Sequence, residues 1–400
     1  MSVSAMVKDL YNPFEKYGIR RVINAATSAT NLGGSIPDPE VFRSMEDASK
    51  SFVVITELQA WAGRKIAEAT GAEAGLPAAS ACNGLTLAAA ACIMKGTELE
   101  GFDPLVRGSW SHISMRLPMH TEGLRTEFIV QRECRNAYDH SVECAGGRFV
   151  EVDSTKEALA SAYDPERTAG YYFTARGARR GLSLEEVVEV AHAKGSYVVV
   201  DAAAENPPKM KLRYYVERGA DLVAYSGGKH IRGPNNSGLL AGRADLIRLA
   251  HLQSYPFSGV GRGSKMSRET IVGLVKALEI YLASDEEAEF AEWLHHVEYF
   301  VEELGSIPGV EAGITYQRIV ETGEPMAPFC CLRLDEGICG MSGRELVSRL
   351  QEGDPKIHTL WEPRFLLGPD CEGMMAINPE YMLEGEHEAV VEAIKEILGV

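Results

Sequence analysis

The sequence predicts an α/β fold in which a mostly parallel sheet is flanked by helices on both faces and is followed by a smaller α+β domain. Two observations lead to this prediction. Short apolar runs alternate with helical patterns up to about residue 265. Among them, the run Tyr197–Val200 is apolar without polar alternation, which is typical of a parallel strand buried on both faces.

The apolar periodicity gives the individual elements in order. The expected helices span 54–70, 83–95, 183–194, 267–283, 286–304, 343–351 and 386–398. The expected strands of the sheet span 74–79, 127–131, 148–152, 170–174, 197–201, 221–225 and 237–241, and those of the small domain span 310–319, 328–334 and 374–378. We therefore expect an N-terminal arm at 1–45, a large domain at 46–265 and a small C-terminal domain at 266–400.

The arm contains prolines and little periodicity, so it resembles a flexible tail in composition. Its apolar run Arg21–Ala26 instead favours docking against the small domain or a partner subunit.

Composition limits the classes of function. The chain has 400 residues, 45% of them hydrophobic, and a formal charge of −17, which disfavours nucleic acid and anionic lipid as partners. The N-terminus lacks the pattern of a secretory signal, and no apolar run approaches the roughly 18–20 residues of a membrane span. We expect a cytoplasmic protein without a membrane partner.

The cysteines and histidines give little support to a metal site. The eight cysteines form no Cys-x-x-Cys pair, and the ten histidines are dispersed. We expect reduced cysteines and no bound metal.

Lys229 is the residue around which the chemistry is best interpreted. It lies in the glycine-flanked run 225–234 and follows Asp201, which ends a buried-strand signal. A pyridinium nitrogen needs an anion and an aldehyde needs an amine, so the pair predicts pyridoxal 5'-phosphate, with Lys229 as its Schiff-base lysine and Asp201 on the ring nitrogen. Taken singly, the two residues are more often a strand-terminal acid and a solvated lysine; their order and the glycines favour the cofactor.

A candidate phosphate site precedes this pair. The small-residue stretch 75–84 lies between a strand and an Ala-rich helix, and a helix N-terminus offers several N–H donors to a phosphate. We expect the phosphate to bind at Ser80, Ala81, Cys82 and Asn83, with Ser226 as a further donor. Ser or Asn before a helix is equally explained as an N-cap.

The glycine-rich basic loop 258–265 is a second anion-binding candidate. Its Arg262 and Lys265 are suited to bind an anion, either the cofactor phosphate or the substrate. A mobile linker with solvated charges explains the loop equally well, and as a dinucleotide fingerprint it fails, because no clear strand precedes it.

Several segments occur in an order that resembles a known enzyme family. These are Asn24, Gly71–Ala74, the stretch 75–84, Asn136–His140, Asp201–Ala203, Ser226–Lys229 and Gly261-Arg262 with Lys265. Over nearly its whole length the chain resembles the SelA-like branch of the fold-type I pyridoxal-phosphate enzymes, which have an aspartate aminotransferase-like fold. That branch includes L-seryl-tRNA(Sec) selenium transferase and, closer in length and motif, the D-glucosaminate-6-phosphate ammonia-lyases.

The resemblance implies a homodimer or larger assembly with active sites between subunits. It also implies that Ala203 is the small residue under the cofactor ring. Two departures put the substrate in doubt: Cys134 stands where relatives usually carry histidine, and Glu380 stands where a possible anion-binding arginine is usual.

With the ring nitrogen protonated, chemistry at the α-carbon of an amino acid is the default. We expect a lyase that converts a hydroxylated amino acid to a 2-keto acid and ammonia, with Lys229 as the proton carrier and its neighbour His230 sharing the acid step or simply packing. The candidates for binding the substrate are Arg135, Arg232 and Arg364, although each is equally explained as a structural arginine.

Three alternatives remain at this stage. An amino-acid racemase or epimerase needs a second acid, for which Cys134 or His112 is a candidate. A selenium transferase acting on charged tRNA is disfavoured by the net charge, and a non-catalytic protein of the same fold is disfavoured by the intact Asp201 and Lys229.

Overall fold

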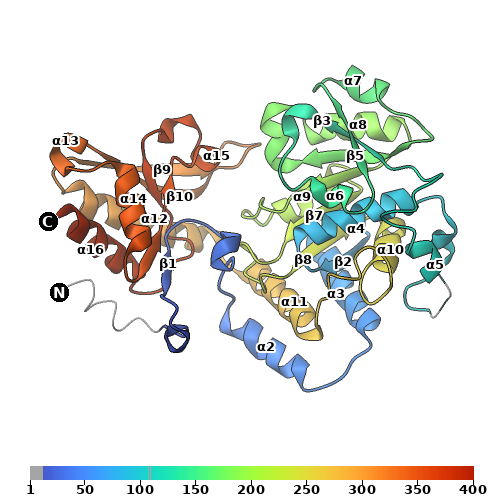
Figure 1. Ribbon diagram of the computed structural model, residues 1–400, viewed down its shortest axis with the longest axis horizontal. Helices are drawn as coiled ribbons and strands as arrows, with labels where there is room; N and C mark the ends of the chain where they lie inside the picture. Colours follow the sequence, from blue (N-terminus) through green and yellow to red (C-terminus); the bar gives the residue numbers. More distant parts are fainter. Residues whose placement is uncertain (1–11, 107, 109) are drawn as a thin grey trace. The chain divides into compact units, whose positions relative to one another are not determined.

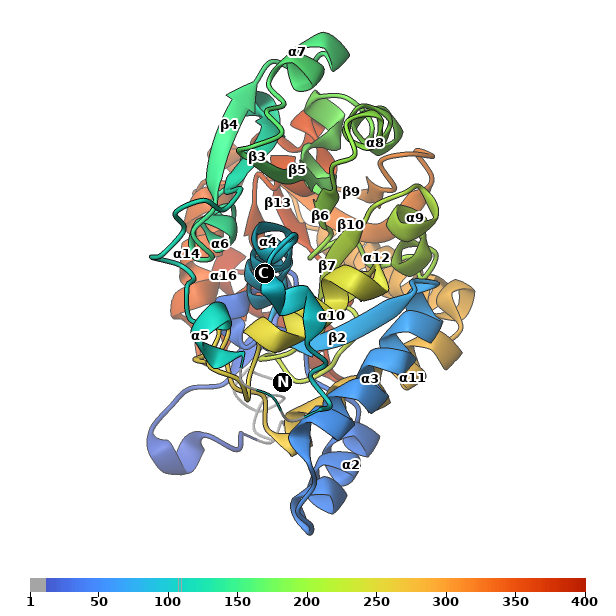
Figure 2. The ribbon, with the colours of Figure 1, turned by 90° about the vertical axis from the view of Figure 1, so that its right-hand side faces the viewer.

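The computed structural model describes residues 12–106, 108 and 110–400. The chain forms two compact units, one made of Ser35–Ser284 and the other of the chain up to Gly34 together with Asp285–Val400. The boundary lies after Ser284 rather than after residue 265, because helix α11 (Arg268–Ala283) packs on α2 (Pro39–Ser49) and α3 (Ile55–Thr70). Figures 1 and 2 show these three helices side by side. The segment 35–45 belongs to the larger unit for the same reason.

The larger unit is built on a sheet that contains seven strands within the described residues. They are β2 (Ala74–Ala78), β3 (Glu127–Gln131), β4 (Arg148–Val152), β5 (Thr168–Thr174), β6 (Val198–Asp201), β7 (Leu222–Ser226) and β8 (Gly238–Gly242). The strand order is β2-β8-β7-β6-β5-β3-β4. The pairs from β7 to β4 are parallel, and β8 runs antiparallel to both of its neighbours.

Helices cover both faces of this sheet (Figure 1). Besides α2, α3 and α11, the larger unit contains α4 (Ala81–Met94), α5 (Ser111–Ser114), α6 (His140–Glu143), α7 (Lys156–Ser161), α8 (Leu184–Ala193), α9 (Lys211–Glu217) and α10 (Ala244–Gln253), with the 3₁₀ helices η3 (Glu98–Gly101), η4 (Arg132–Cys134) and η5 (Ala175–Arg180).

Alternation along the strands assigns each helix to a face, because successive residues of a strand point to opposite sides. Val198 and Val200 belong to the core formed with α3, α8, α9 and α11. Val199 belongs to the core formed with α4, α6 and α10. Asp201, two residues after Val199, therefore points to the face that α4 covers.

Helix α4 is apolar around its whole circumference, as expected of a helix buried on all sides. Its Gly84 lies so close to β7 that a Cβ there would be 3.3 Å from the Cβ of Ala224. This close approach fixes the N-terminus of α4 against the sheet.

The smaller unit contains a four-stranded antiparallel sheet of order β12-β13-β10-β9 and the parallel pair β1-β11 within the described residues. Its strands are β1 (Val22–Asn24), β9 (Val310–Arg318), β10 (Pro325–Leu334), β11 (Lys356–His358), β12 (Leu360–Trp361) and β13 (Met375–Ile377). Its helices are α12 (Glu286–Gly305), α13 (Glu336–Cys339), α14 (Gly343–Glu352), α15 (Arg364–Leu367) and α16 (Glu386–Leu398), with η1 (Glu15–Tyr17), η2 (Thr30–Leu32) and η6 (Pro369–Cys371).

The described part of the N-terminal arm around the apolar run 21–26 is docked on this unit, as that run predicts. Ile23 of β1 is fully buried, and Arg21 forms an ion pair of 2.5 Å with Glu386 of α16. The fold class expected from the sequence is confirmed: a mostly parallel sheet between helices is accompanied by an α+β unit. None of the described helices is both long enough and apolar enough to cross a lipid bilayer.

Candidate active site

The candidate site lies at the carboxyl ends of the central parallel strands, where ligands bind in open α/β sheets. Asp201, the last residue of β6, is paired in register with Thr174 of β5 on one side and with Ala224 of β7 on the other. Lys229 follows the end of β7 by three residues. The sheet therefore brings the acid and the lysine expected from the sequence to the same edge.

Asp201 is buried among groups that have opposing effects on its ionisation. Burial raises the pKa of Asp201, while the Ala203 N–H, the nearby Lys229 and a hydrogen bond from the Asn136 side chain all lower it. The Ala203 N–H donates to Oδ1 at 3.1 Å. A cation placed against this carboxylate would offset the cost of its burial.

Asn136 is held in place by Asp139. The backbone N–H of Asn136 donates to Oδ2 of Asp139 at 3.0 Å, and the Asn136 side-chain oxygen accepts from the Tyr138 N–H. Arg135 also donates to Asp139, at 2.5 Å, so that this buried acid is neutralised on one side. The turn after β3 thus positions an amide on Asp201.

The Lys229 loop is fixed by backbone contacts that only glycines allow. Gly227 accepts a hydrogen bond from the Gly233 N–H, and Gly228 accepts from both the N–H and the hydroxyl of Ser35 at 3.1 Å. A Cβ at Gly228 would lie 2.6 Å from Cα of Asn235. These contacts close the loop tightly around the lysine.

The Lys229 amine lies in an environment that opposes its protonation. Burial lowers the pKa of Lys229, and the Arg176 guanidinium lowers it further, against the opposing effects of Asp201 and Glu205. A neutral amine is the form that can attack an aldehyde or accept a proton.

The phosphate site expected from the sequence falls at the N-terminus of α4. The Ser80 hydroxyl caps the helix by accepting from the Asn83 N–H at 3.0 Å, and the Asn83 side chain accepts from the Ala79 N–H. Among the described residues, the N–H groups of Ala81 and Cys82 have no acceptor. Two donors at the positive end of a buried helix are thus available to an anion.

Ser226 lies beside the N-terminus of α4. Gly238 of β8 is paired with Ser226 of β7 and with Ala78 of β2, two residues before the cap of α4. A Cβ at Gly238 would lie 2.6 Å from the carbonyl carbon of Ser80. The glycine therefore allows the helix N-terminus to lie against the end of β7.

The other expected site residues have different surroundings. His230 is buried with its ring edge-on to Tyr281 of α11, at 5.4 Å between ring centroids, which is a packing contact. Arg135 is engaged by Glu151 as well as by Asp139. Arg364, in the smaller unit, forms an ion pair of 2.8 Å with Glu372.

Three basic residues lie on exposed turns. Arg232 has a left-handed backbone (φ 54°), and its N–H donates to the Lys229 carbonyl. Arg262 lies over the Tyr255 ring, at 5.2 Å from its centroid, and Lys265 is exposed.

Cys134, a candidate second acid for racemisation, donates its thiol to the Gly177 carbonyl at 3.2 Å.

Sequence reasoning missed Arg176, Glu205 and the role of Asn136. All three lie a few residues beyond the carboxyl end of a central strand: β5, β6 and β3. The signal that could have found them is this position, because parallel strands bring such turns together at one edge of the sheet.

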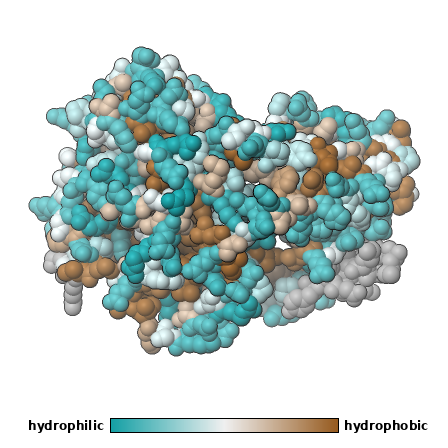
Figure 3. All heavy atoms as spheres, turned by 180° about the vertical axis from the view of Figure 1, so that it is seen from behind, coloured by the Kyte–Doolittle hydropathy of each residue, from teal (hydrophilic) through white to brown (hydrophobic). Residues whose placement is uncertain are grey.

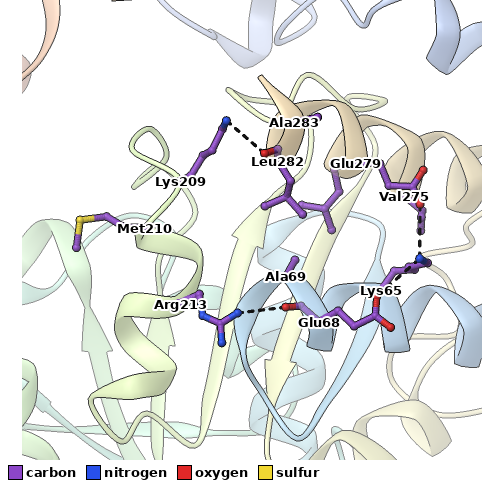
Figure 4. Close-up of a pocket in the computed structure, with 11 residues that line it drawn as sticks. Lys65, Glu68, Ala69, Lys209, Met210, Arg213, Val275, Glu279, Leu282 and Ala283 are labelled. Atoms are coloured by element: carbon purple, nitrogen blue, oxygen red, sulfur yellow. Dashed lines mark hydrogen bonds and ion pairs between the residues drawn. The ribbon is translucent and has the colours of Figure 1, made fainter. Parts of the chain in front are cut away.

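The larger unit also has a groove of about 610 Å³ between α3, α9 and α11 (Figure 4). Its charged side chains are tied to the groove walls. Lys209 donates to the carbonyls of Leu282 and Ser284 at the end of α11, and Arg213 donates to the Glu68 carbonyl at 3.3 Å near the end of α3. Cations at helix C-termini stabilise the helices, which accounts for these two residues.

Comparisons with known proteins identify the family. No protein-family model matches the chain. A 5'-C-glycyluridine monooxygenase-decarboxylase from Streptomyces sp is 31% identical over 404 residues, which cover 96% of this chain and 92% of the relative. The D-glucosaminate-6-phosphate ammonia lyase of Salmonella typhimurium is 29% identical over 396 residues, with 96% and 98% covered. The chain belongs to the SelA-like family of fold-type I pyridoxal-phosphate enzymes.

Solved structures agree with this assignment. The structure of D-glucosaminate-6-phosphate ammonia-lyase superimposes with a TM-score of 0.81 and 28% identity, over 97% of this chain and 98% of that one. A Sphingomonas wittichii serine palmitoyltransferase, at 13% identity over 94% of this chain and 87% of that one, has a TM-score of 0.52 and shares the fold alone.

The residues present fit the cofactor of the SelA-like family. Besides the two N–H groups at α4, the Thr174 hydroxyl is buried without a partner among the described residues, directly beside Asp201 in the sheet. The hydroxyl of Tyr172 is likewise buried without a partner, on the same face. Unpaired buried polar groups are rare in proteins and indicate a missing ligand or water.

Proposed function

We propose that this enzyme eliminates water and ammonia from a hydroxylated amino acid and releases a 2-keto acid. The observation that carries the proposal is the convergence of buried Asp201, the Lys229 amine and the N-terminus of α4 at one edge of the sheet. It supports pyridoxal-phosphate chemistry at an α-carbon. The likeness to an ammonia lyase over 96% of the chain supports elimination as the outcome.

The residues proposed to hold the cofactor have distinct tasks. Lys229 would supply the amine that binds the aldehyde, Asp201 would keep the ring nitrogen protonated, and Ala203 would be the small residue under the ring. Ser80, Ala81, Cys82, Asn83 and Ser226 would bind the phosphate. Binding of the same phosphate by Arg262 and Lys265 stays a prediction, and His230 is better explained by its contact with Tyr281.

The cofactor, when bound, withdraws electrons from the α-carbon of the amino acid attached to it. The Asp201 carboxylate sustains this effect because its negative charge, reinforced by the Asn136 hydrogen bond, favours a protonated ring nitrogen. Lys229 removes the α-proton and can return it to the departing hydroxyl group. This transfer requires a neutral amine, which burial and Arg176 favour by lowering the pKa of Lys229.

The reaction balances without any external oxidant. The C–H bond at the α-carbon and the C–O bond at the β-carbon break, and the hydroxyl leaves as water. The released enamine then takes up water and loses ammonia, so that the net products are a 2-keto acid and ammonia.

A second candidate is oxidative decarboxylation of an amino acid. It is favoured by the 31% identity to a monooxygenase-decarboxylase over 96% of the chain. This reaction breaks the bond to the α-carboxyl group and consumes oxygen, which elimination does not. Racemisation lacks comparable support, because the Cys134 thiol is engaged by a carbonyl and His112 lies exposed on a four-residue helix.

One experiment separates these reactions. Purified enzyme loaded with pyridoxal phosphate is incubated with hydroxylated amino acids of both configurations, with and without oxygen, and ammonia, keto acid and carbon dioxide are measured. Equal release of ammonia and keto acid without oxygen supports elimination. Oxygen-dependent release of carbon dioxide supports the second candidate, and inversion of configuration alone contradicts both.

We also propose a homo-oligomer with active sites between subunits. The linker between α2 and α3 exposes Phe52, Val53 and Val54, with Phe52 95% exposed, which is unusual for a monomer surface. On the face drawn in Figure 3 hydrophilic groups predominate, and apolar groups gather in several patches. Light scattering of the wild type and of Phe52→Ser tests the assembly: a monomeric wild type contradicts it. The cytoplasmic location expected from the sequence stays a prediction.

A further inference from the structure

Arg176 lies at the edge of the candidate site, where its charge lowers the pKa of Lys229. It is the second residue of η5, which directly follows β5, and Thr174 at the end of β5 is paired with Asp201. Arg176 therefore lies in the turn that follows β5, the strand that is paired with Asp201.

Glu205 holds the arginine from the next strand connection. Its carboxylate, four residues after Asp201, is 3.7 Å from Nε of Arg176, and its other oxygen accepts from the Tyr215 hydroxyl at 3.5 Å. The Glu205 side chain is 9% exposed and that of Arg176 is 47% exposed. At this distance the ion pair is weak, so the guanidinium keeps donors that face solvent.

Arg176 also acts electrostatically on the reactive amine. Among the charged groups that act on Lys229, Arg176 has the largest effect, larger than that of Asp201. Its place two residues after Thr174, which is paired with Asp201, puts it at the same edge of the sheet as Lys229. Asp201 and Glu205 oppose its effect on the amine, so acidic and basic groups meet at this edge.

Two of the three arginines expected to bind the substrate are less suitable. Arg135 is engaged by two carboxylates and Arg364 by one. Among the described residues, Arg176 has Glu205 as its only ion-pair partner.

We propose that Arg176, positioned by Glu205, binds the α-carboxylate of the amino-acid substrate. This assignment rests on the proposed function, since it presupposes an amino acid attached at Lys229. A guanidinium binds a carboxylate through two parallel hydrogen bonds, which orients the α-carbon as well as attracting the substrate.

The assignment is tested by binding rather than turnover. Holoenzyme is titrated with alanine and serine of both configurations and with their α-amides, and binding is measured from the absorbance of the cofactor. Wild type should bind the acids at least about tenfold more tightly than the amides, as expected for one charged hydrogen-bonded pair. Arg176→Gln should reduce this preference to about twofold. Arg176→Lys should retain part of it, because lysine keeps the positive charge but cannot form the two parallel hydrogen bonds of a guanidinium group.

Arg180→Gln is the matched control, because Arg180 is an exposed arginine of the same turn. It should leave the preference unchanged. Equal binding of acids and amides by wild type overturns the assignment, and so does an unchanged preference in Arg176→Gln. A third arm compares O-phosphoserine with serine: if Arg176→Gln weakens only the phosphorylated ligand, the arginine binds a remote anion and the carboxylate assignment is wrong.

A second measurement uses the protein without cofactor. The rate at which an acylating reagent modifies Lys229 is followed against pH by mass spectrometry. Arg176→Gln should move the midpoint to higher pH and Arg180→Gln should not; coincident midpoints in all three proteins contradict the electrostatic effect of Arg176 on the amine. Absence of ammonia release would instead contradict the proposed function and would leave both binding results standing.

Discussion

Asn136 donates a side-chain hydrogen bond to Asp201, and it does so from a turn that a second acid, Asp139, holds in place. The contact connects the ends of β3 and β6, strands that are separated by β5 in the sheet. It gives Asp201, the proposed partner of the ring nitrogen, a fixed orientation and favours the ionised form of its carboxyl group. Asn136 is thus a positioning residue whose effect on catalysis acts through Asp201.

Replacing Asn136 with alanine should raise the pKa of Asp201, because the hydrogen bond that lowers it is lost. The carboxylate then becomes protonated at a higher pH, so the acid limb of the pH–rate profile moves upward and α-hydrogen exchange slows by about tenfold. Exchange of the α-hydrogen in deuterated water, measured by NMR across pH, checks both effects. Tyr138→Phe, an exposed neighbour, is the control, and a profile shared by the two variants would remove this role of Asn136.

Asp201→Asn should leave the fold intact, because the side chains are nearly isosteric, yet remove the negative charge opposite the ring nitrogen. We expect α-hydrogen exchange to slow by about 100-fold or more, the usual effect of removing a preorganised charged group. The NMR measurement of α-hydrogen exchange tests this prediction, and circular dichroism checks that the variant is folded. Exchange at the wild-type rate would mean that Asp201 does not contact the ring.

Gly238→Ala should weaken cofactor binding. Its Cβ would lie 2.6 Å from the carbonyl carbon of Ser80, so the N-terminus of α4 must move away from the end of β7. The dissociation constant of pyridoxal phosphate, measured by fluorescence, should rise by about tenfold or more, a loss of about 1.4 kcal/mol. Gly101→Ala, where a Cβ meets nothing within 4 Å, should not change it; equal affinities for the two variants contradict a phosphate site at the N-terminus of α4.

The sequence predicts the sheet well because its strands are buried runs with unambiguous apolar character. All seven expected strands of the larger unit and the long helices are present within about two residues of the expected ends. Helix α2 was not expected because its apolar stripe is short: Val41 is its only fully buried residue, and Met45, one turn later, is only partly buried against the core. Strands β1 and β11, three residues each, depend on each other for pairing, which no local pattern reveals.

The residues of the candidate site also divide into those that a local sequence pattern reveals and those that depend on tertiary pairing. Asp201 and Lys229 are recognisable because their chemistry is specific in sequence, and the cap of α4 because small residues precede a helix. Arg135 was expected to bind substrate, yet its partner Glu151 lies on β4, next to β3 in the sheet. Pairing of that kind depends on strand register, and so does the position of Arg176, which follows the strand paired with Asp201.

The smaller unit should lose stability as the pH falls below about 6.5. His387 of α16 stacks on His296 of α12 with ring centroids 3.6 Å apart. Burial lowers the pKa of His387 to about 4, with His296 lowering it further and Glu388 opposing. Between pH 6.5 and about 4 the unfolded chain therefore binds a proton that the folded chain does not, so stability is complete above pH 6.5 and is lost as the pH falls.

Thermal unfolding between pH 7 and pH 4.5 measures this loss. His387→Phe keeps a ring in the stack and removes the titrating group, so its melting temperature should fall less than that of the wild type over the same interval. Parallel decreases in the two proteins would show that the stacked pair does not account for the pH dependence.

The most direct test of the whole account is to reduce the cofactor-loaded enzyme with borohydride, which fixes pyridoxal phosphate to the lysine that holds it, and to map the adduct by mass spectrometry. Lys194→Ala, an exposed lysine, is the control for Lys229→Ala. The account predicts an adduct on Lys229 in the wild type and in the control, and none in Lys229→Ala. An adduct on another lysine of the wild type, or an undiminished yield in Lys229→Ala, would contradict it.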